Sequence, residues 1–233
     1  MRSIAILPTY NERDNLLGIV DGVLSADPNI HVLIVDDASP DGTGVIADNL
    51  CLRSSRVHVL HRTGRRGRGY AGLDGFKLAV QSGYDVILEM DADHSHPPEA
   101  VPRFLEAIRS ADVVIGSRFM SGAKVDRGWG RKLVSRAANA YIGAMLRLPV
   151  KDASSGYRAF RREALEKIGL ERMVSRGPSV LQEMLIACVQ AGLRIREIPV
   201  DFRKRRHGRS KLDAFKLADS LFRVASFRLK RNT

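Results

Sequence analysis

Short apolar runs alternate with amphipathic segments along the first half of the chain. The runs 4–7, 31–35, 57–60, 86–90 and 113–116 have the length and composition of buried strands. Between them, the spacing of apolar positions predicts helices over 12–24, 70–82 and 97–109. A further helix is predicted to begin after the turn at 36–43 and to end at about residue 50. Strands that alternate with helices in this way predict a mostly parallel sheet covered by helices on both faces.

The second half of the chain is less regular. Apolar spacing predicts helices over 132–148, 162–168 and 179–191 and a strand over 194–202, followed by a basic loop at 203–211. Residues 213–230 carry a broad apolar stripe among Lys216, Arg223, Arg228 and Lys230. Because no repeat, low-complexity tract or linker interrupts the chain, we expect one α/β catalytic domain over residues 1–212 and a basic amphipathic C-terminal extension over 213–233.

Charge changes this picture more than overall composition does. The 233 residues carry a formal net charge of +12 and a sequence pI of about 10.2. Such a balance predicts an anionic partner, which could be nucleic acid, a phosphorylated substrate or an acidic lipid surface. Against nucleic acid, no helix-turn-helix, zinc-finger or RNA-binding signature occurs, and aromatic residues make up 6% of the chain.

Cysteine usage and apolar run lengths bear on location. Cys51 and Cys188 each lie in an apolar segment, which favours reduced core residues and a cytoplasmic setting over a disulfide. The chain runs from Met1 straight into a strand, and no apolar run approaches the roughly 20 residues that span a bilayer. We therefore expect any membrane contact to be peripheral or to come from a small membrane-protein partner.

Polar side chains follow most of the predicted strands, at the edge where parallel sheets bind ligands. Tyr10 and Glu12 follow the first strand, Asp36 and Asp37 the second, Asp91 and Asp93 the fourth, and Arg118 the fifth. An acidic group of this kind in a basic chain is poorly explained as a solvated surface. The pattern indicates a ligand site at this edge.

The segment Asp91-Ala92-Asp93 is the strongest metal candidate in this group. Two carboxylates one residue apart can hold a divalent cation that bridges the oxygens of a diphosphate. The alternative is a turn whose aspartates cap a helix before Pro97. His94 and His96 suggest zinc, but the spacing of a tetrahedral zinc site is absent, and the oxygen-rich neighbours favour Mg²⁺ or Mn²⁺.

The segment 67–72 matches the G-x-G-x-x-G pattern of dinucleotide-binding loops. That loop belongs after the first strand of its fold, whereas here it follows the third and is rich in arginine. We therefore favour close approach to a nucleotide or sugar, or a helix cap, over NAD binding.

Several of these segments together resemble a known family. Residues 8–12, 36–43 and 91–97 look like the nucleotide-binding half of family 2 glycosyltransferases, which have the GT-A fold, and the similarity is closest to dolichyl- and polyprenyl-phosphate mannose synthases. Further similarities lie at 116–119, 131–136, 155–158, 182–184 and 208–212. Each motif is weak alone, but the ordered set covers nearly the whole chain.

The resemblance implies roles for individual residues. Asp91 and Asp93 would hold the metal, with Ser95 near a third ligand position. The sugar nucleotide would contact Pro8, Tyr10, Glu12, Val35, Asp37, Met90, Asp91, Ala92, Arg205 and Lys211, of which Arg205 and Lys211 would clamp phosphates. Arg118, Arg131 and Ser135 would receive the acceptor phosphate and, with Asp93, form the catalytic set.

The implied reaction is an inverting transfer of mannose from GDP-mannose to a polyprenyl or dolichyl phosphate, assisted by Mg²⁺ or Mn²⁺, at the cytoplasmic face of a membrane. A polyprenyl-phosphate glucose synthase and a glycan-extending family 2 transferase remain alternatives. The loop at 65–70 departs from the Lys-Gly-Leu-Gly-like core of the family, and His94 stands where leucine or glycine is common. These departures leave the sugar contacts open. The stripe at 213–230 suits a helix lying in a membrane interface, or one packed on the catalytic domain.

Overall fold

A seven-stranded mixed sheet forms the centre of the computed structural model, which describes residues 1–126, 128–146 and 148–207 except for the side chain of Arg131. The sheet order is β3-β2-β1-β4-β6-β5-β7. The strands are β1 Ser3–Thr9, β2 Ile30–Asp36, β3 Val57–His61, β4 Val86–Glu89, β5 Val113–Ser117, β6 Arg158–Arg161 and β7 Ile195–Pro199. All neighbouring pairs are parallel except those of β6, which is antiparallel to both β4 and β5.

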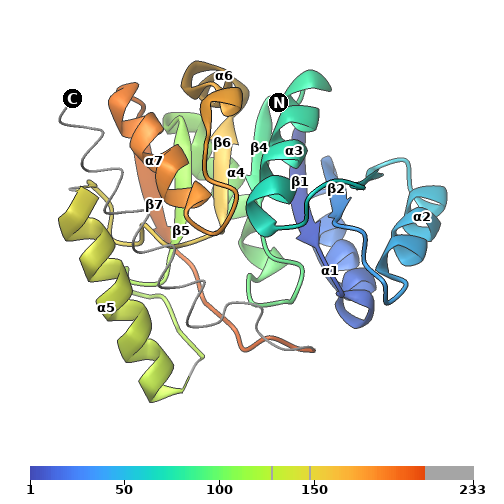
Figure 1. Cartoon of the computed structure of the whole chain (residues 1–233), viewed down its shortest axis with the longest axis horizontal. Coiled ribbons are helices and arrows are strands. Elements are labelled where there is room, and N and C mark those ends of the chain that lie inside the picture. The colour runs from blue at the N-terminus through green and yellow to red at the C-terminus, as the bar shows by residue number, and fades with distance from the viewer. Residues whose placement is uncertain (127, 147, 208–233) are drawn as a thin grey trace.

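Helices cover both faces of this sheet (Figure 1). They are α1 Arg13–Ala26, α2 Thr43–Arg53, α3 Arg68–Gln81, α4 Val101–Ala107, α5 Trp129–Leu146, α6 Arg162–Ile168 and α7 Val180–Gln190, with 3₁₀ turns η1 Pro98–Ala100, η2 Ile108–Ser110 and η3 Leu170–Arg172. The predicted α/β class with a mostly parallel sheet is confirmed.

Two hydrophobic cores follow from the two-residue alternation of strand side chains. In β1, Ile4 and Ile6 belong to the core beneath α3, α6 and α7, whereas Ala5 and Leu7 belong to the core beneath α1 and α4. A strand buried on both faces needs apolar residues at every position, which is why the strands are visible in the sequence as continuous apolar runs.

Two of the predicted elements need correction, and one strand was missed. Strand β6 was not predicted, although it separates β4 from β5. The helix predicted over 97–109 is the shorter α4 between η1 and η2, since Pro97, Pro98 and Pro102 restrict the backbone at its start. The strand predicted over 194–202 ends at Pro199, and Phe202 forms an isolated bridge with Val125. The proposed extension at 213–233 lies outside the described residues.

The two cysteines should differ sharply in reactivity. Cys188 is fully buried in α7, and burial raises the pKa of its thiol to about 12, whereas Cys51 is partly exposed at the end of α2. We therefore expect a thiol reagent at pH 8 to label Cys51 in the native protein and Cys188 after unfolding. Mass spectrometry of the labelled peptides measures this order, and equal native labelling of both thiols would contradict the burial of α7.

Candidate functional site

The carboxyl ends of β1, β2, β4 and β5 meet at one edge of the sheet, where Thr9, Asp36, Glu89 and Ser117 are the last strand residues (Figure 1). This arrangement brings together the acidic segments that follow β1, β2 and β4. Arg118 follows β5 at the same edge, and the side chains at this edge are linked by ion pairs.

Asp91 is held by an arginine from the start of α3. Arg68 Nη2 lies 2.9 Å from Asp91 Oδ1, and Arg68 Nη1 lies 3.3 Å from the buried Glu89 Oε1. Burial alone would raise the pKa of Asp91, but Arg68 and then Arg205 outweigh it and hold this pKa well below its usual range. Asp91 is therefore an anion whose partner, Arg68, was not singled out in the sequence.

Asp93 is held by the segment that follows β7. Arg205 Nη2 lies 2.7 Å from Asp93 Oδ2, and Arg205 Nη1 lies 3.6 Å from Glu12 Oε1. The backbone N–H of Arg206 donates to the Asp93 carbonyl, and that of Arg203 donates to the Ser95 carbonyl. Residues 203–206 thus lie along residues 93–95, which places Arg205 against both carboxylates.

Asp91, Asp93 and Ser95 carry oxygen atoms, which are the ligands that a hard divalent cation prefers. The Ser95 hydroxyl is buried and has no hydrogen-bond partner among the described residues, while the Ser95 N–H donates to Asp93 Oδ1 at 2.9 Å. No group of three or more His, Cys, Asp or Glu side chains suited to a metal occurs in the described part of the chain. Mg²⁺ typically takes one or two protein carboxylates and completes its shell with substrate phosphates and water, so two aspartates are sufficient.

The two histidines beside these aspartates have other partners. His96 Nδ1 accepts a hydrogen bond from the Asp91 N–H, and the His96 ring stacks on Tyr157 with centroids 4.9 Å apart. Burial lowers the pKa of His96. His94 Nε2 lies 3.2 Å from the Asn15 carbonyl oxygen. His96 thus orients the backbone at Asp91 instead of forming a shared ligand set with His94.

The residues predicted to contact the nucleotide differ in how far their side chains are exposed to a ligand. Asp37 pairs with Arg62 and accepts the Gly67 N–H at 2.6 Å, and Arg66 lies over the Tyr10 ring at 5.3 Å. Pro8 and Tyr10 are partly exposed, and the buried Glu12 joins the Arg205 contact described above. The side chains of Val35, Met90 and Ala92 are buried, so these three offer a ligand backbone atoms at most.

The G-x-G-x-x-G segment serves close packing. A Cβ atom at Gly69 would lie 2.5 Å from the Arg176 carbonyl, and one at Gly72 would lie 2.7 Å from Glu89 Oε1. These glycines let the first turns of α3 approach the 175–177 loop and Glu89. The same approach brings Arg68 to the acidic pair.

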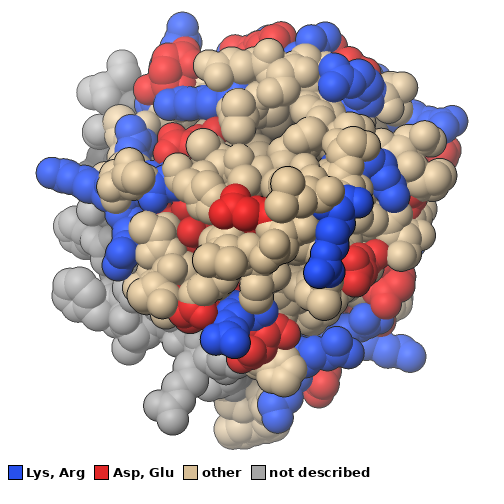
Figure 2. Space-filling view, turned by 90° about the vertical axis from the view of Figure 1, so that its right-hand side faces the viewer, with Lys and Arg blue, Asp and Glu red and all other residues tan. Residues whose placement is uncertain are grey.

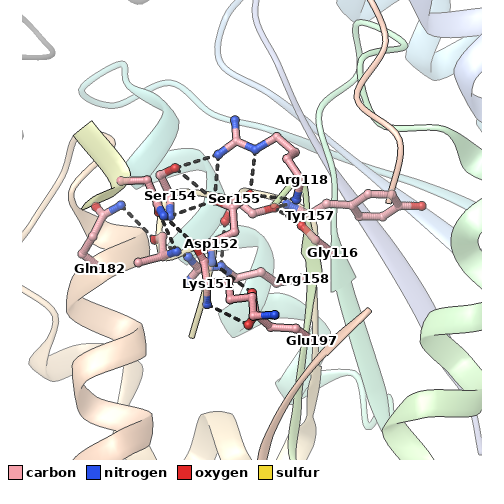
Figure 3. Close-up of polar contacts among 12 residues, drawn as sticks. Gly116, Arg118, Lys151, Asp152, Ser154, Ser155, Tyr157, Arg158, Gln182 and Glu197 are labelled. Atoms are coloured by element: carbon pink, nitrogen blue, oxygen red, sulfur yellow. Dashed lines mark hydrogen bonds and ion pairs between the residues drawn. The ribbon is translucent and has the colours of Figure 1, made fainter. Parts of the chain in front are cut away.

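Arg118 is fixed by a buried carboxylate, as Figure 3 shows. Its Nε lies 2.7 Å from Asp152 Oδ2, its Nη2 lies 2.8 Å from Asp152 Oδ1, and its backbone N–H also donates to Asp152. The Ser154 hydroxyl contacts Arg118 Nη2 at 2.6 Å. Burial would raise the pKa of Asp152, but Arg118 outweighs it and lowers that pKa. The guanidinium orientation is therefore set by two parallel hydrogen bonds.

A second buried arginine stabilises the loop that carries Asp152. Arg158 donates to the carbonyl oxygens of Ser155, Leu181 and Ala153 at 2.6–2.8 Å (Figure 3). Burial lowers the pKa of Arg158 to about 10, so the side chain remains charged at neutral pH. The bond to Leu181 fastens residues 151–158 to α7, and the Ser155 hydroxyl fastens them to β5 by donating to the Gly116 carbonyl at 2.6 Å.

A cavity of about 210 Å³ opens beside Arg118. It is lined by Arg118, Phe119, Ala123, Val125, Lys132, Ser135 and Arg136. Three cations, one hydroxyl and no carboxylate among the lining residues suit an anion. The structure thus brings the predicted Arg118 and Ser135 together and adds Lys132 and Arg136, which lie in the quoted segment 131–136 but were not singled out. The side chain of Arg131 and all of Lys211 lie outside the described residues.

The chain is similar in sequence to several known mannosyltransferases. The chain is 43% identical over 98% of its length to the polyprenol monophosphomannose synthase of Mycolicibacterium smegmatis, covering 88% of that protein. It is also 43% identical to the undecaprenyl-phosphate mannosyltransferase of Micrococcus luteus, covering 98% of this chain and 95% of the relative. The dolichol-phosphate mannosyltransferase of Pyrococcus furiosus is 39% identical over 91% of this chain and 59% of the relative.

A solved structure shares the fold. Glucosyl-3-phosphoglycerate synthase from Mycobacterium tuberculosis, in complex with Mn²⁺, uridine diphosphate and glucosyl-3-phosphoglycerate, superposes with a TM-score of 0.70 at 21% identity, over 98% of this chain and 79% of that one. The sequence profile of Glycosyl transferase family 2 matches residues 4–169. With these matches spanning most of its length, the chain belongs to glycosyl transferase family 2.

Proposed function

We propose that this chain transfers mannose from GDP-mannose to a polyprenyl phosphate. The observation that carries the proposal is the 43% identity, over 98% of the chain, to relatives described as polyprenol monophosphomannose synthase and undecaprenyl-phosphate mannosyltransferase. The site supports it because a pair of carboxylates and an anion-binding cavity lie at one edge of the sheet. A reaction between two phosphorylated substrates requires both features.

For the donor, we assign the diphosphate to the Asp91 and Asp93 side. Asp91, Asp93 and Ser95 would hold Mg²⁺ or Mn²⁺, in line with the Mn²⁺ in the structural relative. When bound, the cation supplies charge neutralisation at the leaving diphosphate. Arg205, which already bridges Glu12 and Asp93, would contact the same phosphates together with Lys211. The nucleoside would lie against Pro8, Tyr10, Glu12 and Asp37 and against backbone atoms of Val35, Met90 and Ala92.

For the acceptor, we assign the lipid phosphate to the cavity lined by Arg118, Lys132, Ser135 and Arg136, with Arg131 from the same helix. Asp152 holds Arg118 in one orientation, so that an arriving phosphate meets a positioned donor group. The phosphate is already ionised at neutral pH, and no side chain needs to remove a proton from it.

The chemistry is a single displacement. An oxygen of the acceptor phosphate forms a bond to the anomeric carbon of mannose, while the bond from that carbon to the nucleoside diphosphate breaks and GDP leaves. Attack opposite the leaving group inverts the anomeric configuration and converts an α-linked donor into a β-linked product. The residues of this chain contribute placement and charge stabilisation, which are large terms in such reactions.

None of the described helices is long and apolar enough to cross a bilayer. Since the acceptor is a lipid, we propose that the enzyme associates peripherally with the cytoplasmic face of a membrane. The segment 213–233 and a small membrane-protein partner are the candidates from sequence for this attachment.

A panel of sugar nucleotides tests the proposed function. Purified protein with a short-chain polyprenyl phosphate and Mg²⁺ or Mn²⁺ should consume GDP-mannose in preference to UDP-glucose, GDP-glucose and UDP-N-acetylglucosamine, as measured by the release of nucleoside diphosphate. Preference for a glucosyl donor would replace mannose by glucose in the assignment. Transfer to a glycan but to no polyprenyl phosphate would overturn it.

Lys132→Ala should mainly impair use of the lipid phosphate. Loss of one charge-assisted phosphate contact costs roughly 1.5–3 kcal/mol, which corresponds to a roughly 10- to 100-fold rise in KM for the polyprenyl phosphate. The dissociation constant of GDP, measured by calorimetry, should change little. Lys77→Ala, on α3, is the matched control. An equal loss of GDP affinity in Lys132→Ala would show that the cavity binds the donor and not the lipid phosphate.

A further inference from the structure

Arg68 stands between two carboxylates that differ in their exposure. Its Nε and Nη2 donate to Asp91 Oδ1 at 3.3 and 2.9 Å, and its Nη1 donates to Glu89 Oε1 at 3.3 Å. The Glu89 side chain is 2% exposed, whereas the Asp91 side chain is 35% exposed. A cation that arrives from solution can therefore reach Asp91 but not Glu89. Arg68 competes with any such cation for Asp91.

The second oxygen of Glu89 lacks a donor. Oε2 is buried and has no hydrogen-bond partner among the described residues. An arginine pairs most strongly with a carboxylate through two parallel hydrogen bonds, but Arg68 gives Glu89 only one, because its Nε and Nη2 donate to Asp91. A buried acceptor without a donor costs free energy. Glu89 can therefore accept a second hydrogen bond from Arg68 once Asp91 releases it.

The surroundings of Arg68 leave room for this exchange of partners. A Cβ atom at Gly156 would lie 2.7 Å from Arg68 Nη2, and one at Gly72 would lie 2.7 Å from Glu89 Oε1. Because both positions are glycines, no side chain there separates the guanidinium group from Glu89. The pair is also largely shielded from water, unlike the interspersed acidic and basic residues on the face of the molecule at α2 (Figure 2). Shielding makes such a pair stronger than a surface pair.

We propose that Arg68 neutralises Asp91 in the metal-free protein and moves to both oxygens of Glu89 when Asp91 binds the divalent cation. This inference rests on the proposed function, which takes Asp91 as a ligand of the metal on the donor diphosphate. Two cations at one carboxylate repel each other, so Arg68 lowers the affinity of the nucleotide-free site for metal. Glu89 limits this penalty by accepting Arg68 in its second position.

The exchange makes metal binding depend on the nucleotide. A Mg²⁺ ion that binds one or two protein carboxylates takes the rest of its ligands from substrate phosphates and water. The diphosphate of the donor therefore supplies the additional binding free energy that displaces Arg68 from Asp91. Arg68 thus keeps Asp91 paired until the nucleotide arrives.

Arg68→Leu tests the competition. Kd for Mn²⁺ without nucleotide, measured by electron paramagnetic resonance of the free ion, should fall roughly tenfold or more, because Asp91 no longer has to be released. Arg66→Leu, which removes an arginine that lies over the Tyr10 ring, is the control and should change Kd little. Unchanged or weaker Mn²⁺ binding by folded Arg68→Leu would overturn the proposal. If thermal unfolding shows that this variant is not folded, Arg68→Gln should give the same result.

Glu89→Gln tests where Arg68 goes. Glutamine has nearly the same shape, but its amide NH₂ cannot accept the second hydrogen bond, so Arg68 should stay on Asp91. Kd for Mn²⁺ should then rise by roughly three- to tenfold. In the Arg68→Leu background, the same substitution should have little effect. An equal rise in both backgrounds would show that Glu89 attracts the metal through its own charge, and would overturn the exchange of partners.

Mn²⁺ binding in the presence of GDP separates failure of this inference from failure of the proposed function. Wild-type protein that binds Mn²⁺ with GDP, together with unchanged affinity in Arg68→Leu, keeps the metal site and overturns the role of Arg68 alone. Wild-type protein that binds no Mn²⁺ with or without GDP overturns the metal assignment and this inference together. The expected changes in Kd, found in a protein that transfers glucose instead of mannose, support the inference and overturn the proposed function alone.

Discussion

Asp93→Ala should reduce mannosyl transfer by roughly 100- to 1,000-fold, the usual consequence of removing one electrostatic stabiliser of a transition state. The variant removes a proposed metal ligand and the ion pair between Asp93 and Arg205. Asp91→Asn should have a comparable effect, because its amide cannot replace the charge of the carboxylate. Initial rates with GDP-mannose and a short polyprenyl phosphate, measured across a Mn²⁺ titration, test both variants.

The control for these variants is Asp21→Asn, which removes an exposed carboxylate from α1 and should leave turnover unchanged. Circular dichroism and thermal unfolding establish that each variant is folded. Near-normal turnover of Asp91→Asn or Asp93→Ala in the presence of EDTA would show that the carboxylates do not act through a metal.

Asp152→Ala should be the most destabilising single change at the site. It leaves the largely buried Arg118 without its carboxylate, and breaking a buried ion pair costs about 3–5 kcal/mol. For a protein of this size, that loss lowers the melting temperature by roughly 6–20 °C. The variant should also raise KM for the lipid phosphate, because Arg118 loses its fixed orientation.

The effect of Asp152→Ala should depend on pH in a defined direction. The folded-state pKa of Asp152 lies below its unfolded value, so its stabilisation is present above about pH 4 and disappears as the pH falls through the folded-state pKa. Urea denaturation should give a constant difference between wild type and variant from pH 8 to 5 and a smaller one below. Glu106→Ala, which breaks the exposed pair with Arg109, is the control and should change the melting temperature little. A difference that persists undiminished at acid pH would exclude the ion pair as its cause.

Most strands were predictable because burial on both faces requires continuous apolar runs. Strand β6 escaped because its sequence Arg-Ala-Phe-Arg begins and ends with a charge. Arg158 is buried all the same, since three carbonyl oxygens accept its hydrogen bonds, and these come from residues distant in sequence as well as near. A pattern of apolar positions cannot predict a strand whose buried residue is a cation, because the hydrogen bonds that stabilise this cation form only in the folded protein.

Site residues that directly follow strands were predictable from the sequence. The arginines that form ion pairs with them were not. Asp91 and Asp93 stand out because they follow an apolar strand. Their partners come from the start of α3 and from the segment after β7, and the sequence contains many arginines that could serve equally well. The signal for Arg68 was available in the departure of the 65–70 loop from its family pattern. Only the close approach at Gly69 and Gly72 shows why an arginine there reaches Asp91.

The configuration of the product tests the central claim most directly. Purified protein should be supplied with GDP-mannose, a short-chain polyprenyl phosphate and Mg²⁺ or Mn²⁺, and the lipid product analysed by mass spectrometry and by NMR of the anomeric carbon. The account predicts one mannose joined to the lipid phosphate in the β configuration, formed together with one GDP. An α-linked product, or release of free mannose with no lipid product, would contradict it.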